Sequence, residues 1–183
     1  MKMARSTVPA ATAAAVAVCF ALGACAAVPA ATSTVPSVDV ERYLGTWYEV
    51  GSVKQFFSIG LVNTRAEYSL LPGGSIRVEN SGNYIGPNGP RSRIVGTAVP
   101  VDTTNARLNV SFTGVNSSSP PGNYWIVDLD PDYQWAIVSD PTGVSAFLLS
   151  RTKAVTSDLY RDLLTRAAAK GVHTGGITPT PQY

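Results

Sequence analysis

The sequence predicts an all-β fold: an eight-stranded antiparallel up-and-down β-barrel with one C-terminal α-helix packed outside it. From about residue 38 to residue 151, apolar and polar residues alternate with period two, and turn sequences divide this region at near-regular intervals. After residue 155 the apolar residues recur at helical spacing. Eight strands close into a barrel wide enough for one small ligand, and closure removes unpaired sheet edges.

The strands are predicted from alternation within short segments. SIRVEN, RIVGTA and ARLNVSF each place apolar or small residues on one face, and NYWIVDLD, YQWAIVSD and VSAFLLSR are rich in β-branched and aromatic residues. The turn sequences between them are LPGG, GPNGP, SSSPPGN, DPD and DPTG. The predicted strands lie near 46–53, 62–70, 75–83, 91–99, 106–113, 123–129, 133–139 and 145–151.

One amphipathic helix follows the strands. TSDLYRDLLTRAAAKG has three leucines at helical spacing, Thr156 or Ser157 can cap its start, and Gly171 marks its end. Its apolar stripe needs a surface, and the outer wall of the barrel is the expected one. The tail, 173–183, shows no periodicity and is predicted to be irregular.

The N-terminus has the features of an export signal. Lys2 and Arg5 precede an apolar stretch over 8–22, and the stretch ends in LGAC. A branched apolar residue, two small residues and a cysteine resemble the lipobox of bacterial lipoproteins, which implies lipidation of Cys25 and anchoring to a membrane of the cell envelope. A plain signal peptide and a single spanning helix are the alternatives, although a span needs about 20 apolar residues.

This interpretation divides the chain into a signal peptide (1–24), lipidated Cys25 with a flexible tether (25–37), a folded domain (38–172) and the tail (173–183). Cys19 falls in the signal, so no internal disulfide is expected after cleavage. The chain has 14 basic and 12 acidic residues, and removing Lys2 and Arg5 leaves 12 of each. With only 14% charged residues, a nucleic-acid partner is not expected.

The order of elements, with two short motifs, resembles the lipocalin family. Gly45-Thr46-Trp47 resembles the family's first motif, and Leu149-Ser-Arg151-Thr resembles its third. The second motif is matched only in part, within DLDPDYQW. With the lipobox, the resemblance is to the branch that holds bacterial outer-membrane lipoproteins. It implies that Trp47 plugs the closed end, that Gly45 avoids a Cβ clash there, and that Arg151 stacks on the indole.

The resemblance also extends strand parity to a ligand-binding lining. If Trp47 points inward, the lining comprises Ala66, Tyr68, Ile76, Val78, Asn80, Ile94, Gly96, Leu108, Val110, Phe112, Tyr124, Ile126, Val138 and Phe147. Residues near the closed end are expected to be ordinary core. Ala66 and Gly96 are expected to leave volume unfilled, and Tyr68, Tyr124 and Asn80 to contact a polar head group.

Two features near the first strand stay open. Phe56 and Phe57 lie in the loop that forms a lid in lipocalins, so they either gate the mouth or pack on its rim. Glu49 shares the parity of Trp47, and an inward carboxylate is costly unless it is paired. We expect a buried partner such as Arg or Tyr, or a local twist that exposes the carboxylate.

Catalytic and metal-binding patterns are sparse. His173 is the one histidine and lies in the tail, where a solvated side chain is expected. Asp128, Asp130 and Asp132 could form a calcium-like loop, but the Gly and distal Glu of such a loop are missing and a hairpin turn is favoured. No metal or cofactor is expected.

The resemblance implies a membrane-anchored binding protein for a small lipophilic molecule of the fatty acid or lysophospholipid class. Envelope lipid storage, transport or repair would be its role. The alternatives are a lipid-modifying enzyme on the same scaffold, with Tyr and Asp128 as the available reactive groups, and a filled barrel that serves as an interaction module.

Overall fold

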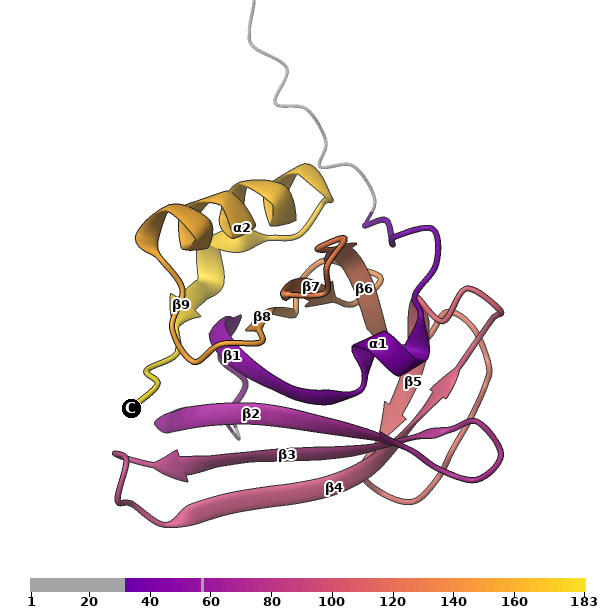
Figure 1. Cartoon of the computed structure of the whole chain (residues 1–183), viewed down its shortest axis with the longest axis horizontal. Helices are drawn as coiled ribbons and strands as arrows, with labels where there is room; N and C mark the ends of the chain where they lie inside the picture. Colours follow the sequence, from indigo (N-terminus) through magenta and orange to yellow (C-terminus); the bar gives the residue numbers. More distant parts are fainter. Residues whose placement is uncertain (1–31, 57) are drawn as a thin grey trace, which may run out of the picture.

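The computed structural model of the chain describes residues 32–56 and 58–183 (Figure 1). The signal segment 1–24, Cys25 and Phe57 lie outside the described residues. Within the described ranges, no helix is long and apolar enough to cross a membrane.

Eight strands form one antiparallel meander, and each predicted range lies within two residues of the observed one. The strands are β1 (Gly45–Val53), β2 (Leu61–Leu70), β3 (Ile76–Tyr84), β4 (Arg91–Pro100), β5 (Arg107–Ser111), β6 (Tyr124–Leu129), β7 (Trp135–Ser139) and β8 (Ala146–Ser150). Each pairs with the next along the chain, and β1 pairs with both β8 and β2. The sheet therefore closes into a barrel, as the alternation predicts.

The strands separate an inner core from an outer one. Ile126 and Val127 are adjacent on β6 and both are fully buried, yet Ile126 packs with Trp47 inside the barrel and Val127 packs on the outside. Successive side chains of a strand point to opposite faces, so one strand serves both cores.

Helix α2 (Ser157–Ala169) covers the outer core (Figure 1). Thr156 caps its start, its side-chain oxygen accepting from the backbone N of Leu159, and Gly171 follows its end at a φ of +83°. Leu163 and Ala167 are fully buried against the barrel wall. The helix lies outside the barrel, as predicted.

The short helix α1 (Val40–Tyr43) leads into the barrel at its closed end. The Asp39 carboxylate accepts a hydrogen bond from the backbone N of Arg42 and so caps the helix. Residues 32–37, assigned to the flexible tether, lie against the barrel instead. The Val35 N donates to the Ile126 O at 3.0 Å, and Val35 packs on the inner core. The Pro- and Thr-rich composition of this stretch predicts a tether and gives no indication that the apolar side chain of Val35 packs on the barrel.

The C-terminal tail is ordered, and the prediction of an irregular tail is wrong. It forms a 3₁₀ turn, η1 (Thr174–Gly176), and a short strand, β9 (Ile177–Pro179), that pairs with β1. Pairing of β1 with β2 stops at Tyr48 and Arg65, and the chain's last residues occupy the seam beyond that point. A three-residue strand that ends in Pro carries no alternation to detect.

Two hydrogen-bond sets hold the tail in this seam. The Asn63 N of β2 donates to the Pro181 O at 2.8 Å. The Gln182 side-chain nitrogen donates to the Glu49 O of β1 and to the Thr64 O of β2, each at 2.8 Å. The tail thus fills the gap between β1 and β2 as an additional segment of the wall at the open end of the barrel, next to the start of β2 (Figure 1).

Candidate functional site

The residues of the predicted lining lie on the inner face of the barrel wall. Cross-strand partners share a face, and Trp47, Ala66, Asn80 and Ile94 are successive partners across β1 to β4. Ala66, Tyr68, Ile76, Val78, Leu108, Ile126 and Val138 are buried; Asn80, Gly96, Val110, Tyr124 and Phe147 are half-buried; Ile94 and Phe112 are exposed. The exposed members lie toward the open end, so the inner surface is accessible there.

The closed end of the barrel is sealed by Trp47, which is completely buried. The guanidinium carbon of Arg151 lies 3.8 Å from the centre of its ring. The same guanidinium donates to three backbone oxygens, Arg42 O at 2.7 Å, Thr46 O at 2.9 Å and Tyr133 O at 3.2 Å. One side chain therefore links α1, β1 and the β6–β7 turn.

Gly45 serves this end through its backbone conformation. Its φ is +87°, a region that residues with a Cβ rarely adopt. A Cβ there would lie 3.6 Å from Nη1 of Arg151, which is ordinary contact distance. The glycine is therefore not required to avoid the expected Cβ clash. It is required because the turn from α1 into β1 places this residue in the left-handed region.

Three tyrosine hydroxyls meet inside the barrel. The Tyr124 hydroxyl lies 2.9 Å from that of Tyr43 and 2.9 Å from that of Tyr68. Burial raises the pKa of Tyr68 to about 12, partly offset by the hydrogen bond with Tyr124, and burial also raises the pKa of Tyr43 and of Tyr124. The cluster stays neutral at physiological pH and supplies hydroxyls within an apolar chamber.

A second polar cluster lies near the open end and answers the question about Glu49. Its Oε1 accepts from the Ser52 hydroxyl at 2.7 Å, the Lys54 Nζ at 2.5 Å and the Thr180 hydroxyl at 2.5 Å. Glu49 is 6% exposed, and it shares the inner face with its cross-strand partner Leu149. The partner is Lys54, with two hydroxyls, rather than the Arg or Tyr that the sequence suggested.

The residues of this cluster differ in how far the sequence indicated them. The parity of Glu49 indicated that a partner was needed. Lys54 could have been found as the nearest cation along the chain, five residues away. Nothing in the sequence pointed to Thr180, 131 residues away, because its position depends on the tail filling the seam.

The comparisons with known proteins agree with this geometry. A family model described as a lipocalin-like domain matches residues 38–182. The chain belongs to the lipocalin family. It is 35% identical over 159 residues to temperature-induced lipocalin-1 of Arabidopsis thaliana, with 81% of each chain covered. It is 34% identical over 144 residues to the outer membrane lipoprotein Blc of Escherichia coli K12, with 78% of each covered.

More distant relatives agree on the fold. Rat apolipoprotein D is 34% identical over 112 residues, which cover 61% of this chain and 54% of that protein. Among solved structures, the cockroach allergen Per a 4 matches with a TM-score of 0.60 at 18% identity, over 82% of this chain and 93% of the allergen chain. Lobster apocrustacyanin A1 matches with a TM-score of 0.59 at 16% identity, over 84% and 91%.

In this lipocalin, the absent side chain of Gly96 does not leave open volume. A Cβ at Gly96 would lie 2.6 Å from the ring of Phe112 and 2.4 Å from the Ser111 O. The ring of Phe112 therefore occupies the volume that Gly96 was predicted to leave free for a ligand. At Ala66 the side chain is buried in the inner core beside Trp47.

Of the two residues predicted to form the lid, only Phe56 is among the described residues, and it is 87% exposed. The choice between a gate and rim packing therefore stays a prediction.

Of the candidate reactive residues, the tyrosines of the cluster lie inside the barrel, whereas the aspartates and the histidine lie away from the lipocalin's interior. Asp128 is on the outer wall, where its carboxylate accepts from the Arg166 guanidinium of α2 at 3.5 Å. His173 has an exposed side chain and precedes η1. Asp130 caps the β6–β7 turn by accepting from the backbone N of Asp132 and of Gln134. Among the described residues, no group of three or more His, Cys, Asp and Glu side chains could hold a metal ion.

Proposed function

We propose that this lipocalin binds a small lipophilic molecule, of the fatty acid or lysophospholipid class, inside the barrel. One observation carries the proposal: apolar inner-face side chains pass from fully buried at Trp47 to 48% exposed at Ile94 and 38% exposed at Phe112. Covering exposed apolar surface releases about 25 cal/mol per Å², which favours an apolar guest at the open end.

The polar groups of the interior favour a guest with one polar end. Asn80 lies between Ala66 and Ile94 on the inner face and is half-buried. The tyrosine hydroxyls and the Glu49–Lys54 cluster already have partners within the protein. A head group would therefore contact Asn80 and the rim, with the chain of the guest against Ile94 and Phe112.

We also propose that the protein is exported and anchored to an envelope membrane through lipidated Cys25, where it would store, carry or help to repair membrane lipids. The name of the related Blc proteins, outer membrane lipoproteins, supports this placement. Changing Cys25 to Ser should move the protein from the membrane fraction to the soluble fraction. Continued sedimentation with membranes would contradict the anchor.

Native mass spectrometry of the protein with a lipid extract tests the binding directly. A matched pair of variants on β4 then tests the location: Ile94→Trp faces the interior, and Val95→Trp is next to it on the outer face, where Glu79 is its partner. We expect Ile94→Trp to weaken fatty acid binding about tenfold through crowding, and Val95→Trp to leave it unchanged.

Phe112→Trp and Tyr124→Trp should weaken binding in the same way as Ile94→Trp. Equal affinity in the two β4 variants would place the guest outside the barrel. If no lipid stays bound to the wild-type protein, the filled-barrel interaction module is favoured. Chemical turnover of a bound lipid would favour the enzyme.

A further inference from the structure

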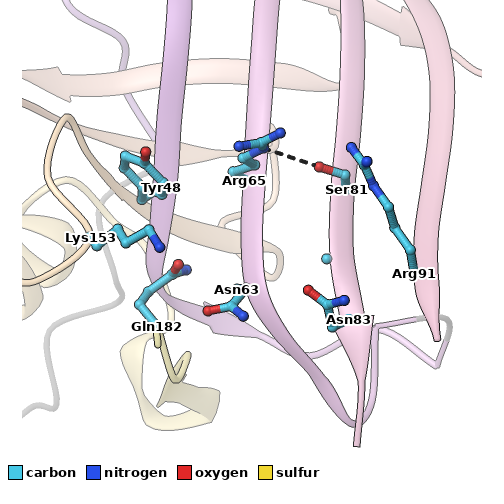
Figure 2. A pocket seen from close by; sticks show the side chains of 9 residues that line it. Tyr48, Asn63, Arg65, Ser81, Asn83, Arg91, Lys153 and Gln182 are labelled. Carbon is cyan, nitrogen blue, oxygen red and sulfur yellow. Dashed lines mark hydrogen bonds between the residues drawn. The ribbon is translucent and has the colours of Figure 1, made fainter. Parts of the chain in front are cut away.

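A second hollow lies on the outside of the barrel, over β1 to β4, with a volume of about 310 Å³ (Figure 2). Its lining includes Asn63, Arg65, Ser81, Asn83, Arg91 and Lys153. Arg65 precedes Ala66 of the inner lining on β2, so the two side chains leave opposite faces of the wall. The hollow is therefore separate from the proposed lipophilic site.

A β-bulge shapes this hollow. Val62 pairs with Asn83 and Arg65 with Ser81, so two residues of β2 lie opposite the single Gly82. Asn63 adopts a φ of +52°, and both Asn63 and Arg65 line the hollow. The bulge thus lies at the hollow, and Asn63 and Arg65, two positions apart on β2, both line it.

The C-terminal segment frames one side. The Tyr183 N donates to the Asn63 side-chain oxygen at 2.6 Å, and the Lys153 Nζ donates to the Tyr183 O at 2.9 Å. The tail, which fills the seam between β1 and β2, therefore forms one side of the hollow. The contact with Tyr183 holds the Lys153 Nζ at the hollow that the two arginines also line.

Charge in the hollow is unbalanced. Three cationic side chains line it and no carboxylate does. Elsewhere on this sheet, Arg77 and Arg93 both bind the Glu79 carboxylate, at 2.8 Å and 2.5 Å. Within residues 32–56 and 58–183, neither Arg65 nor Arg91 forms an ion pair.

The two unpaired guanidinium groups lie close to one hydroxyl. The Arg65 Nε donates to the Ser81 Oγ at 3.4 Å, and among the described residues its terminal nitrogens donate to no side-chain acceptor. Figure 2 shows the Arg65 and Arg91 guanidinium groups on either side of Ser81, with Lys153 across from them. Such a set of planar donors suits a multiply charged oxyanion.

We propose that this hollow binds the phosphate group of a phosphate-bearing ligand. A phosphate group, as the free ion or in an ester, offers at least two non-bridging oxygens that share negative charge and two ester or hydroxyl oxygens, which matches two guanidinium groups and the neighbouring amide donors better than a single carboxylate does. Inorganic phosphate and a phospholipid head group share this chemistry, and the bulge with its two unpaired arginines recognises the group common to both.

Titration of the ¹⁵N-labelled full chain with sodium pyrophosphate, inorganic phosphate or a water-soluble short-chain phosphatidylglycerol tests the proposal. We expect saturable amide shifts at 63–65 and 81–83. The double variant Arg65→Gln/Arg91→Gln should weaken binding at least about tenfold, because it removes two charge-assisted donors.

Arg93→Gln is the matched control, because Arg93 lies on the same strand as Arg91 but pairs with Glu79. It should keep the wild-type affinity. Arg65→Lys/Arg91→Lys keeps both charges and lacks the planar fork, so it should bind more weakly than wild type and more tightly than the Gln variant. This series remains informative if the Gln variant fails to fold.

The inorganic phosphate and lipid probes distinguish the sources, and pyrophosphate, which carries the phosphate group twice, counts with inorganic phosphate. Binding of inorganic phosphate and lipid alike assigns recognition to phosphate alone, and binding of the lipid only assigns it to a phosphodiester head group; both results support the site. Absence of shifts in the wild-type protein at millimolar probe, shifts confined to the barrel interior, or undiminished binding in the double Gln variant would overturn it.

Discussion

The closed and open ends of the barrel hold a cation next to the inner core in different ways. At the closed end, the Arg151 guanidinium lies over Trp47 and donates to three backbone oxygens. At the open end, Lys54 pairs with the buried Glu49 carboxylate, beside two hydroxyls. The backbone oxygens that bind Arg151 are positioned as soon as the backbone around them has folded. The side-chain partners at the open end are positioned only when several segments of the chain have come together.

The difference shows where the barrel is rigid and where it can admit a guest. Trp47 is completely buried, whereas Phe112 on the same inner surface is 38% exposed. We therefore expect the larger contribution to stability from the closed end, while the open end keeps exposed apolar area that the proposed guest would cover.

Replacing the aromatic residue at each end should give the largest effect. We expect Trp47→Ala to lower the free energy of unfolding by about 3–5 kcal/mol, because it leaves a cavity beneath Arg151. Phe112→Ala should cost about 1 kcal/mol, since much of its ring is already in water. Denaturant unfolding of both variants measures the comparison, and equal losses would remove the contrast between the ends.

Replacing the cation at each end should give a smaller effect. Arg151→Met keeps an apolar stem but leaves three backbone oxygens without their donor, so we expect a loss of about 2–4 kcal/mol. Lys54→Met should cost about 1–2 kcal/mol, because the Ser52 and Thr180 hydroxyls still bind the Glu49 carboxylate. Arg93→Met, on the outer surface, is the control in the same unfolding assay. A greater loss for Lys54 than for Arg151 would contradict the assignment.

The tyrosine cluster between the ends should give the smallest effect, visible only in alkali. The pKa of Tyr68 is raised by burial to about 12 from an ordinary value of about 10. A phenol with a raised pKa contributes stability below pH 10 that is lost as the pH rises toward 12. Burial also raises the pKa of Tyr160, outside the cluster, so ultraviolet absorbance should show four of the eight tyrosines ionising late, together with alkaline unfolding.

A Tyr68→Phe variant provides the control for this titration. It should reduce the late-ionising group by one residue, to three. If all tyrosines of the folded wild-type protein ionised together near pH 10, the cluster would not be buried as described.

Much of the fold could be predicted from local pattern. The ranges of β1 to β8 and of α2, and the pairing of Trp47 with Arg151, follow from alternation and from two short motifs. The packing of Phe112 on Gly96 could not be predicted. A sequence shows that a small residue leaves volume, but it does not show which side chain of the next strand fills that volume. The outer hollow was also missed, because it depends on a bulge.

The sequence by itself determined which side chains share a face within each regular stretch of strand. Period-two alternation forces every second residue of a strand to the same side, and this requires no knowledge of neighbouring strands. It also determined that Glu49 needed a partner.

Only the tertiary structure decided how the barrel closes at its open end. There β1 and β2 separate, and the last residues of the chain enter the seam and bring Thr180 to Glu49 and Tyr183 to Asn63. These contacts join residues more than a hundred positions apart, so they depend on where whole strands meet in space. Local propensity cannot specify such a meeting, because its free energy is realised only after the rest of the barrel has formed.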